Sequence, residues 1–412
     1  MIIGVDATCW ANKRGFGRFT RDLLESVLQI DRTNEYLFFL DRETAESEQL
    51  PASAKTIVVD TRVSPVKAAA ANGSRSVADL WAMSRSVSKQ KMDVFFFPAV
   101  YSYFPVFNSA KIIVTIHDVI ADRHPKLIFP NFKSKLFWKF KQNLAVRQAD
   151  LILTVSQYSK RQIASYFNLS DSKMRVVCEG ARPIFKRVRR GGIKIVEKLK
   201  KYNLEENENF LLYVGGISPH KNLSTLIEAF VAVDSALKSE NLKLVLVGDY
   251  KDDPFFSAYP HLKKQIAELG LENKVIFTGF VPDEDLVYLY NAAQLLVFPS
   301  FEEGFGLPAI EAMNCGTPVA ASYGSSLPEV LGVAGSYFDP QNSAEMAETI
   351  TRVLSSRSLR NLMSRKGLKR AEEFQWEKAA MQTLEIFDEL SKGESRNIAV
   401  QSEPTIITRL FF

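Results

Sequence analysis

The sequence is poor in cysteine and histidine, and it has no long apolar runs. Its three cysteines, Cys9, Cys178 and Cys315, are far apart and form no C-x-x-C pair, which argues against a disulfide scaffold or a zinc site and favours a reducing compartment. No apolar run reaches the roughly 20 residues that a membrane-spanning helix needs. The first residues run directly into a strand pattern, so we expect no signal peptide. These absences favour a cytoplasmic globular protein.

The charges are distributed unevenly along the chain. Residues 1–190 hold 30 Lys and Arg against 17 Asp and Glu, a balance of +13, whereas the remainder has a balance of −8. A basic half indicates an anionic partner, and a phosphorylated lipid, a membrane surface and a nucleic acid all remain open at this point. The 412 residues are 46% hydrophobic and 24% charged, which is ordinary for a globular protein of two domains.

Short apolar runs alternate with helical patterns throughout, which is typical of parallel α/β layers. The pattern restarts after a basic segment, 186–192, so we expect domains at 1–187 and 193–370, a helix over 371–392 and a loose tail over 393–412. Two such domains create a cleft, and open α/β sheets bind ligands beyond the carboxyl ends of their strands. The predicted strands are 1–5, 36–40, 56–59, 94–97, 112–116, 151–155 and 175–178, then 210–214, 242–247, 275–277, 295–298, 318–321 and 336–338.

The most informative stretch is residues 298–318, FPSFEEGFGLPAIEAMNCGTP. Residues 307–313 predict a helix, with Pro308 in the first turn, where a missing N–H costs nothing. A helix N-terminus has unpaired N–H groups and a partial positive charge, so it favours a phosphate. Glu303 and Glu311 would then accept hydroxyl protons on either side of that phosphate. A nucleotide sugar has this layout, and the alternative is a glycine-rich turn with two surface glutamates.

The same string resembles the Glu-x7-Glu signature of the retaining glycosyltransferases of family 4, in which SxxEGFGLPxxEAM is close to a fingerprint. The resemblance covers nearly the whole chain, up to FQWEKAA at residues 374–380. It implies the GT-B fold, an α/β architecture of two facing Rossmann-like domains with a central cleft and a C-terminal helix that crosses back to the first domain. It also implies transfer of a sugar from a nucleotide diphosphate sugar to an acceptor, with the anomeric configuration retained.

The resemblance assigns roles to the residues that match its motifs. Glu303 would hold sugar hydroxyls and Glu311 the ribose, while Lys221, in VGGISPHKN, would reach the diphosphate. His117, in VTIHD, would lie near the anomeric carbon. The expected catalytic residues are therefore His117, Lys221 and Glu303, and the expected donor-binding residues are Gly17, Gly216, Lys221, Phe280, Val281, Glu303, Gly304, Phe305, Gly306, Leu307 and Glu311.

One departure from the family concerns the diphosphate. Many members carry an arginine where this chain has Gly216, which leaves the second neutralising charge open, and His220 or an arginine of the first domain could replace it. A loop over 12–21, with Gly15 and Gly17, is expected to lead into a helix over 22–30 and to face the cleft.

Other features have two interpretations. Residues 283–285 are formally a D-x-D metal motif, but we interpret them as the acidic start of a helix over 286–293 and expect no metal and no other cofactor. Residues 132–147 predict a basic, aromatic-rich helix, with either a solvated lysine face over packed aromatic side chains or a surface that contacts an anionic membrane. Single-stranded nucleic acid fits the same composition, but no motif for it accompanies the helix. Ser156 is expected to cap a helix, and Asp118 either caps one or orients His117.

The sequence thus predicts a metal-independent, retaining hexosyltransferase. The favoured donor carries mannose, and the favoured acceptor is a saccharide or a lipid-linked molecule of surface polysaccharide or glycolipid synthesis, with peripheral contact at the inner membrane face left open. A non-catalytic binding protein with the GT-B fold is one alternative, and the intact Glu303, Glu311, His117 and Lys221 argue against it. A nucleotide-sugar epimerase on the same fold is the other, and it would need an added acid and base that the sequence does not offer.

Overall fold

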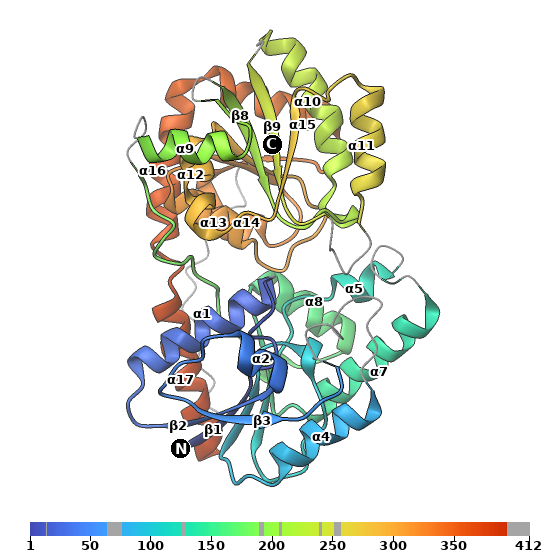
Figure 1. Ribbon diagram of the computed structural model, residues 1–412, viewed down its shortest axis with the longest axis vertical. Helices are drawn as coiled ribbons and strands as arrows, with labels where there is room; N and C mark the ends of the chain where they lie inside the picture. Colours follow the sequence, from blue (N-terminus) through green and yellow to red (C-terminus); the bar gives the residue numbers. More distant parts are fainter. Residues whose placement is uncertain are drawn as a thin grey trace.

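The computed structural model of the chain describes residues 1–13, 15–63, 76–125, 129, 131–188, 193–205, 208–238, 241–250 and 257–393. Two parallel β-sheets organise these residues, one in each half of the chain. Figure 1 shows them as two domains along the long axis of the molecule. Most of the predicted linker, 189–192, and the predicted tail beyond Gly393 lie outside the described residues.

The first sheet has seven strands in the order β3-β2-β1-β4-β5-β6-β7, and all neighbours are parallel. Short runs of aromatic and β-branched residues form these strands because such side chains fit a pleated surface, and the central strands β1, β4 and β5 are almost completely buried. Along β4, Phe95 and Phe97 face one core and Phe96 faces the other, as the two-residue period of a strand requires. The strands are β1 (Ile2–Asp6), β2 (Glu35–Asp41), β3 (Lys55–Val59), β4 (Val94–Phe97), β5 (Lys111–Thr115), β6 (Leu151–Thr154) and β7 (Met174–Val176).

Helices cover both faces of the first sheet. Leu23 of α1 belongs to the core on one face, whereas Met83 of α4 and Trp138 of α7 belong to the core on the other. The helices are α1 (Gly15–Ile30), α2 (Arg42–Ser47), α4 (Val77–Ser88), α5 (Ile120–Arg123), α7 (Phe132–Gln148) and α8 (Gln157–Phe167), with short 3₁₀ helices at Val100–Ser102 and Asp171–Lys173.

The second sheet has six parallel strands in the order β10-β9-β8-β11-β12-β13. Its strands are β8 (Asn209–Val214), β9 (Leu242–Val247), β10 (Val275–Gly279), β11 (Leu295–Phe298), β12 (Val319–Ser322) and β13 (Gly335–Phe338). Its helices are α9 (Ile193–Lys201), α10 (Leu223–Leu237), α11 (Tyr259–Glu268), α12 (Asp283–Ala292), α13 (Leu307–Asn314), α14 (Leu327–Leu331), α15 (Ser343–Ser355) and α16 (Arg357–Ala371), with 3₁₀ helices at Pro219–Lys221 and Gly332–Ala334.

Helix α17 (Trp376–Lys392) returns from the second domain to the first. It packs along α1, and its Phe387 ring lies 5.6 Å from the ring of Phe96 in β4. Trp376, at its start, lies 5.9 Å from Phe19 of α1. This crossing helix and the two parallel sheets confirm the predicted fold class.

Helix α1 begins earlier than the sequence predicts. The expected loop through Arg21 is wrong, because the helix already starts at Gly15. A Cβ at Gly17 would lie 1.9 Å from the carbonyl oxygen of Asn12, so glycine is what lets the chain fold back on itself and enter the helix. In the sequence, Gly15 and Gly17 indicate a loop. In the structure both lie in the first turn of α1, and Gly17 is required because its backbone packs against the backbone of Asn12.

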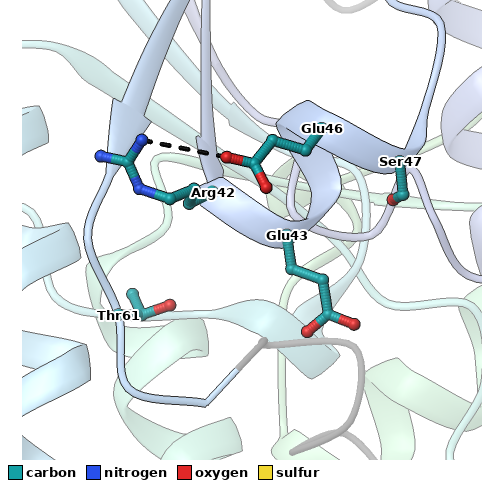
Figure 2. A pocket seen from close by; sticks show the side chains of 5 residues that line it. All are labelled: Arg42, Glu43, Glu46, Ser47 and Thr61. Carbon is teal, nitrogen blue, oxygen red and sulfur yellow. Dashed lines mark ion pairs between the residues drawn. The ribbon is translucent and has the colours of Figure 1, made fainter.

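Two further observations concern surfaces. Within the described residues, no helix is long and apolar enough to cross a membrane. Figure 2 shows an open hollow on the first domain beside α2, and its five lining residues are absent from the predicted site. Charged side chains dominate it, with Arg42 4.0 Å from Glu46, and the lining residues are Arg42, Glu43, Glu46, Ser47 and Thr61.

Candidate functional site

The start of α13 lies where the two domains meet. Gly306 precedes the helix with φ +108°, a conformation that favours glycine, and no side chain caps the described N-terminus of α13. A Cβ at Gly304 would lie 2.8 Å from the carbonyl oxygen of His117 in the first domain. The carbonyl oxygen of Gly304 also accepts hydrogen bonds from the hydroxyls of Ser156 and Ser159, at 2.7 and 3.0 Å. The glycine-rich loop is therefore held directly against the first domain.

Glu303 is paired with Lys221. The Nζ atom of Lys221, in the 3₁₀ helix after β8, lies 2.6 Å from Oε1 of Glu303. Both side chains are largely buried, with exposed fractions of 16% for Lys221 and 10% for Glu303. The structure thus brings together two of the three predicted catalytic residues and places both beside the start of α13.

Glu311 is paired with an arginine of the first domain. Its Oε1 atom lies 2.6 Å from Nη2 of Arg18 in α1, and its Oε2 accepts a hydrogen bond of 2.7 Å from the hydroxyl of Tyr290. Burial raises the pKa of Glu311, and the charge of Arg18 opposes that rise. Burial alone would lower the pKa of Arg18, but the carboxylates of Glu311 and Asp283 raise it, so the guanidinium stays charged.

His117 follows β5 and faces a buried carboxylate. Its Nδ1 lies 3.7 Å from Oε1 of Glu179, its Nε2 lies 3.1 Å from the carbonyl oxygen of Pro98, and Phe19 contacts the ring edge-on at 4.7 Å. Burial raises the pKa of Glu179, and His117 opposes the rise. Asp118 accepts a hydrogen bond from the backbone N–H of Ile120, at 2.9 Å, but the residue at the N-cap position of α5 is Val119, so the expected capping role of Asp118 is wrong.

The remaining predicted donor-binding residues are distributed around this centre. Gly216 is exposed at the end of β8, and its carbonyl oxygen accepts a hydrogen bond from Tyr213. Phe280 is also exposed, with Nζ of Lys13 from the first domain 5.4 Å from its ring centre, whereas Val281 is buried. Each of these three residues follows the carboxyl end of a strand of the second sheet, where an open α/β sheet binds its ligands. Their roles in donor binding stay predictions.

The D-x-D residues are engaged by basic side chains. Asp283 lies 3.3 Å from Arg18 and 3.2 Å from Arg182, both from the first domain. The carboxylate oxygens of Asp285 lie within 2.6 Å of the Nζ atoms of Lys198 and Lys201, and Oδ2 accepts a hydrogen bond from the hydroxyl of Tyr202. Burial would raise the pKa of Asp285, but the hydrogen bonds, above all those from the two lysines, lower it to about 2. Helix α12 begins at Asp283 rather than at residue 286, so these acids lie inside its first turn.

Sequence reasoning missed a second set of contacts across the domains. Glu302, next to the motif glutamate, accepts hydrogen bonds from Arg123, from His124 at 2.9 Å and from Tyr158 at 3.0 Å. Glu329 accepts hydrogen bonds from the backbone N–H groups of residues 157 and 158 at the start of α8. The predicted cap is confirmed there too, because Ser156 accepts a hydrogen bond from the N–H of Ser159.

The arrangement suits an anion flanked by hydroxyl groups. The uncapped start of α13 offers N–H groups and a positive dipole end, and Lys221 and Arg18 bring a cation from each domain. Each motif carboxylate can accept two or more hydroxyl protons. Among the described residues, no group of three His, Cys, Asp or Glu side chains has the geometry of a metal site.

The chain matches two family profiles and resembles known glycosyltransferases. "Glycosyltransferase Family 4" matches residues 15–183, and "Glycosyl transferases group 1" matches residues 195–370. O-antigen chain mannosyltransferase B of Escherichia coli is 33% identical over 285 residues, which are 67% of this chain and 69% of that protein.

Solved structures show the same architecture. Sucrose-phosphate synthase from Thermosynechococcus elongatus has a TM-score of 0.75 and 20% identity over 96% of this chain and 100% of that one. Anabaena HepE in complex with UDP-glucose has a TM-score of 0.70 and 19% identity over 94% and 99%. At these identities the two structures show the GT-B fold alone. Together with the profile matches and the E. coli relative, they establish that the chain belongs to the group 1 glycosyltransferases of family 4.

Proposed function

We propose that the protein transfers a sugar from a nucleoside diphosphate sugar to an acceptor hydroxyl and retains the anomeric configuration. The observation that supports this most is the pairing at α13, where Glu303 and Glu311 flank the uncapped helix start and each faces one cation. The bound donor would place sugar hydroxyls on Glu303, ribose hydroxyls on Glu311 and its diphosphate at the helix start.

Arg18 is, in this proposal, the arginine that replaces the charge missing at Gly216. Lys221 forms an ion pair with Glu303, and Arg18 forms an ion pair with Glu311. Donor hydroxyls that bind the two carboxylates would compete with these ion pairs, so both cations would be released toward the diphosphate. Because Arg18 comes from the first domain and Lys221 from the second, full neutralisation of the diphosphate would require both domains.

The barrier to reaction lies in separating a negative diphosphate from an oxocarbenium-like sugar. Electrostatic stabilisation of the leaving group is therefore the main task, and we assign it to Lys221, Arg18 and the N–H groups around residues 305–307. The acceptor oxygen bonds to the anomeric carbon as the bond to the diphosphate breaks, and the leaving phosphate takes the acceptor proton. His117 would line this reaction centre, because its carbonyl oxygen faces Gly304.

The substrate assignment rests on the relatives. O-antigen chain mannosyltransferase B is a third identical to this chain, which supports mannose as the sugar and a polysaccharide or lipid-linked acceptor. The enzyme would need no metal, since Asp283 and Asp285 are held by basic side chains. We place it in the cytoplasm, in peripheral contact with the inner membrane face.

The test is nucleoside diphosphate release in EDTA from GDP-, UDP-, dTDP- and ADP-sugars, with and without lipid-linked O-antigen-type acceptors. One nucleotide family should support transfer, and the product should keep the donor's anomeric configuration by NMR. Glu311→Gln should abolish turnover. Glu268→Gln, the same change at an exposed ion pair on α11, is the matched control and should leave turnover unchanged.

Gly216 favours one competing function, a donor-binding protein that has lost catalysis. Such a protein would bind a nucleotide sugar in the same assay and release no diphosphate with any acceptor. An epimerase would instead change the sugar of the donor without any acceptor. Turnover that depends on the acceptor excludes both.

A further inference from the structure

Two helices of the first domain present large apolar side chains to solvent. On α7, Phe132, Leu136 and Phe140 follow one another at four-residue intervals and so form one stripe. The expectation of packed aromatic side chains beneath a lysine face is therefore wrong, since Trp138 is the buried aromatic residue of this helix. The exposed fractions along α7 are 73% for Phe132, 58% for Leu136, 43% for Phe137 and 62% for Phe140.

Helix α4 and the loop beside it carry a second exposed group. Trp81 lies 6.5 Å from Phe107, ring centre to ring centre, and Val77 lies one turn before Trp81 on the same helix. All three are more exposed than buried, at 60%, 64% and 81% respectively. Single exposed apolar residues are ordinary, but seven on neighbouring elements mark an interaction surface.

The two groups lie on the same side of the first sheet. The inner faces of α4 and α7 share one core, to which Met83 and Trp138 belong, so their outer faces both point away from that sheet face. Figure 1 shows α4 and α7 on the outside of the first domain. We define the apolar-basic surface as the outer faces of α4 and α7 with Phe107.

The charge of this surface has one sign. Helix α7 contains no acidic residue, and its Lys133, Lys135 and Lys139 are exposed around the apolar stripe. The one acidic residue of α4, Asp79, is buried, while Arg85 is exposed. A protein partner of ordinary composition carries charges of both signs, so it matches a purely basic surface poorly. An anionic lipid bilayer has negative headgroups above an apolar interior, and it therefore matches both the lysines and the apolar side chains.

The apolar-basic surface is connected to the site by packed rings. Trp138, on the inner side of α7, lies 5.0 Å from Tyr101, and Tyr101 stacks at 4.6 Å on Phe16 in the first turn of α1. Two residues further along α1, Arg18 reaches Glu311. A membrane that holds α7 would therefore lie against the same domain that contributes Arg18 to the site.

We propose that the apolar-basic surface docks on an anionic lipid bilayer, with the side chains of Phe132, Leu136, Phe140 and Trp81 inserted among the acyl chains and the lysines at the headgroups. This docking supplies the surface for the peripheral membrane contact of the proposed function. It does not depend on catalysis, because binding to vesicles requires neither donor nor acceptor.

Vesicle flotation of the full chain tests the proposal, with Trp81 as a built-in reporter because the other three tryptophans are buried. Vesicles that contain phosphatidylglycerol should bind the protein more tightly than pure phosphatidylcholine vesicles. Binding should shift Trp81 emission to the blue, and brominated lipids should quench it. Trp81→Phe should remove the signal and keep flotation.

Two triple variants separate the apolar and the basic parts of the surface. Lys133→Gln/Lys135→Gln/Lys139→Gln should weaken binding about a hundredfold, at about fivefold for each lysine near an anionic surface. Ser in place of Phe132, Leu136 and Phe140 should weaken it at least tenfold, with an unchanged melting temperature because these side chains are exposed.

The controls are Val333→Ser and Lys264→Gln, an exposed apolar and an exposed basic residue of the second domain, and both should float like the wild type. Failure of the wild type to float, or equal flotation of the triple variants, would overturn the proposal. So would binding of a single-stranded oligonucleotide in place of vesicles. Diphosphate release, measured separately, decides the proposed function.

Discussion

Replacing Lys221 by methionine separates the structural and catalytic roles of this side chain. Met has a similar length but no charge, so Lys221→Met leaves the Glu303 carboxylate buried without its partner. At 2.6 Å and an effective dielectric constant of about 20, the attraction between the two charges is about 6 kcal/mol. Part of that attraction offsets the cost of burying both charges, so the expected loss of stability is about 3 kcal/mol.

The loss should be visible as a lower melting temperature of the second domain. For a domain of this size, 1 kcal/mol corresponds to about 2–4 °C, so calorimetry should show a decrease of about 10 °C. If Lys221 also stabilises the leaving diphosphate, kcat/KM should fall about 10²- to 10³-fold.

The double variant Lys221→Met/Glu303→Gln distinguishes the two effects. Removing both charges leaves no unpaired carboxylate, so the melting temperature should recover most of its loss. Turnover, measured as diphosphate release, should stay at least as low as in the single variant, because Glu303 is itself assigned to donor binding. Near-normal turnover of Lys221→Met, or a double variant that regains activity together with stability, would refute the assignment of Lys221 to the leaving group.

Three further predictions concern the interdomain contacts and pH. Arg18→Ala should raise the donor Kd about 10- to 100-fold in calorimetry. Adding Gly216→Arg to that variant should recover part of the affinity. An unchanged Kd in Arg18→Ala would contradict the role of Arg18. Gly304→Ala should lower kcat about tenfold, because the added Cβ would lie 2.8 Å from the carbonyl oxygen of His117 and hold the domains apart. An unchanged kcat in steady-state kinetics would show that turnover does not need this close contact between the domains. Burial raises the pKa of Asp122 from 3.8 to about 6, so the folded state binds the proton more tightly than the unfolded state, and stability should decrease as pH rises from about 4 to 6. Asp122→Asn should reduce that decrease by about 2 kcal/mol in denaturant titrations, and an identical pH profile would show that this carboxyl is not responsible.

The strands could be predicted almost completely from the sequence. All thirteen form at the expected places, usually within one or two residues. Most are short apolar runs bounded by polar or turn residues, and the central strands, such as β4 and β11, are fully buried, so local composition and tertiary burial agree. Val94–Phe97 and Leu295–Phe298 match their predicted bounds, because a proline follows each run and ends it.

The candidate site was predictable where one motif contains the chemistry. Glu303, Glu311 and the helix start between them lie within one strand–loop–helix unit, so their spacing fixes their arrangement. Their partners were not predictable. Arg18 and Glu179 reach the site only through the docking of two domains, and a solvated arginine is the commoner state of such a residue. Glu302 adjoins the motif, but its three partners all come from the first domain.

The helical errors have a physical cause as well. Gly15 and Gly17 suggested a loop because glycine weakens helices, whereas a close backbone approach at Asn12 is what requires Gly17. The aromatic residues of α7 suggested a packed face because burial is their usual state. Whether these side chains are buried depends on which other elements pack over α7, and the sequence of α7 alone does not give that information.

The central claim is that Glu303 and Glu311, with one cation from each domain, form a metal-free site for a nucleoside diphosphate sugar. Calorimetric titration of the wild type and Glu311→Gln with GDP-mannose and UDP-glucose in EDTA tests it most directly. The wild type should bind one of the two donors, and Glu311→Gln should bind it at least tenfold more weakly. Absence of binding to either donor, or equal affinity of the two proteins, would contradict the account.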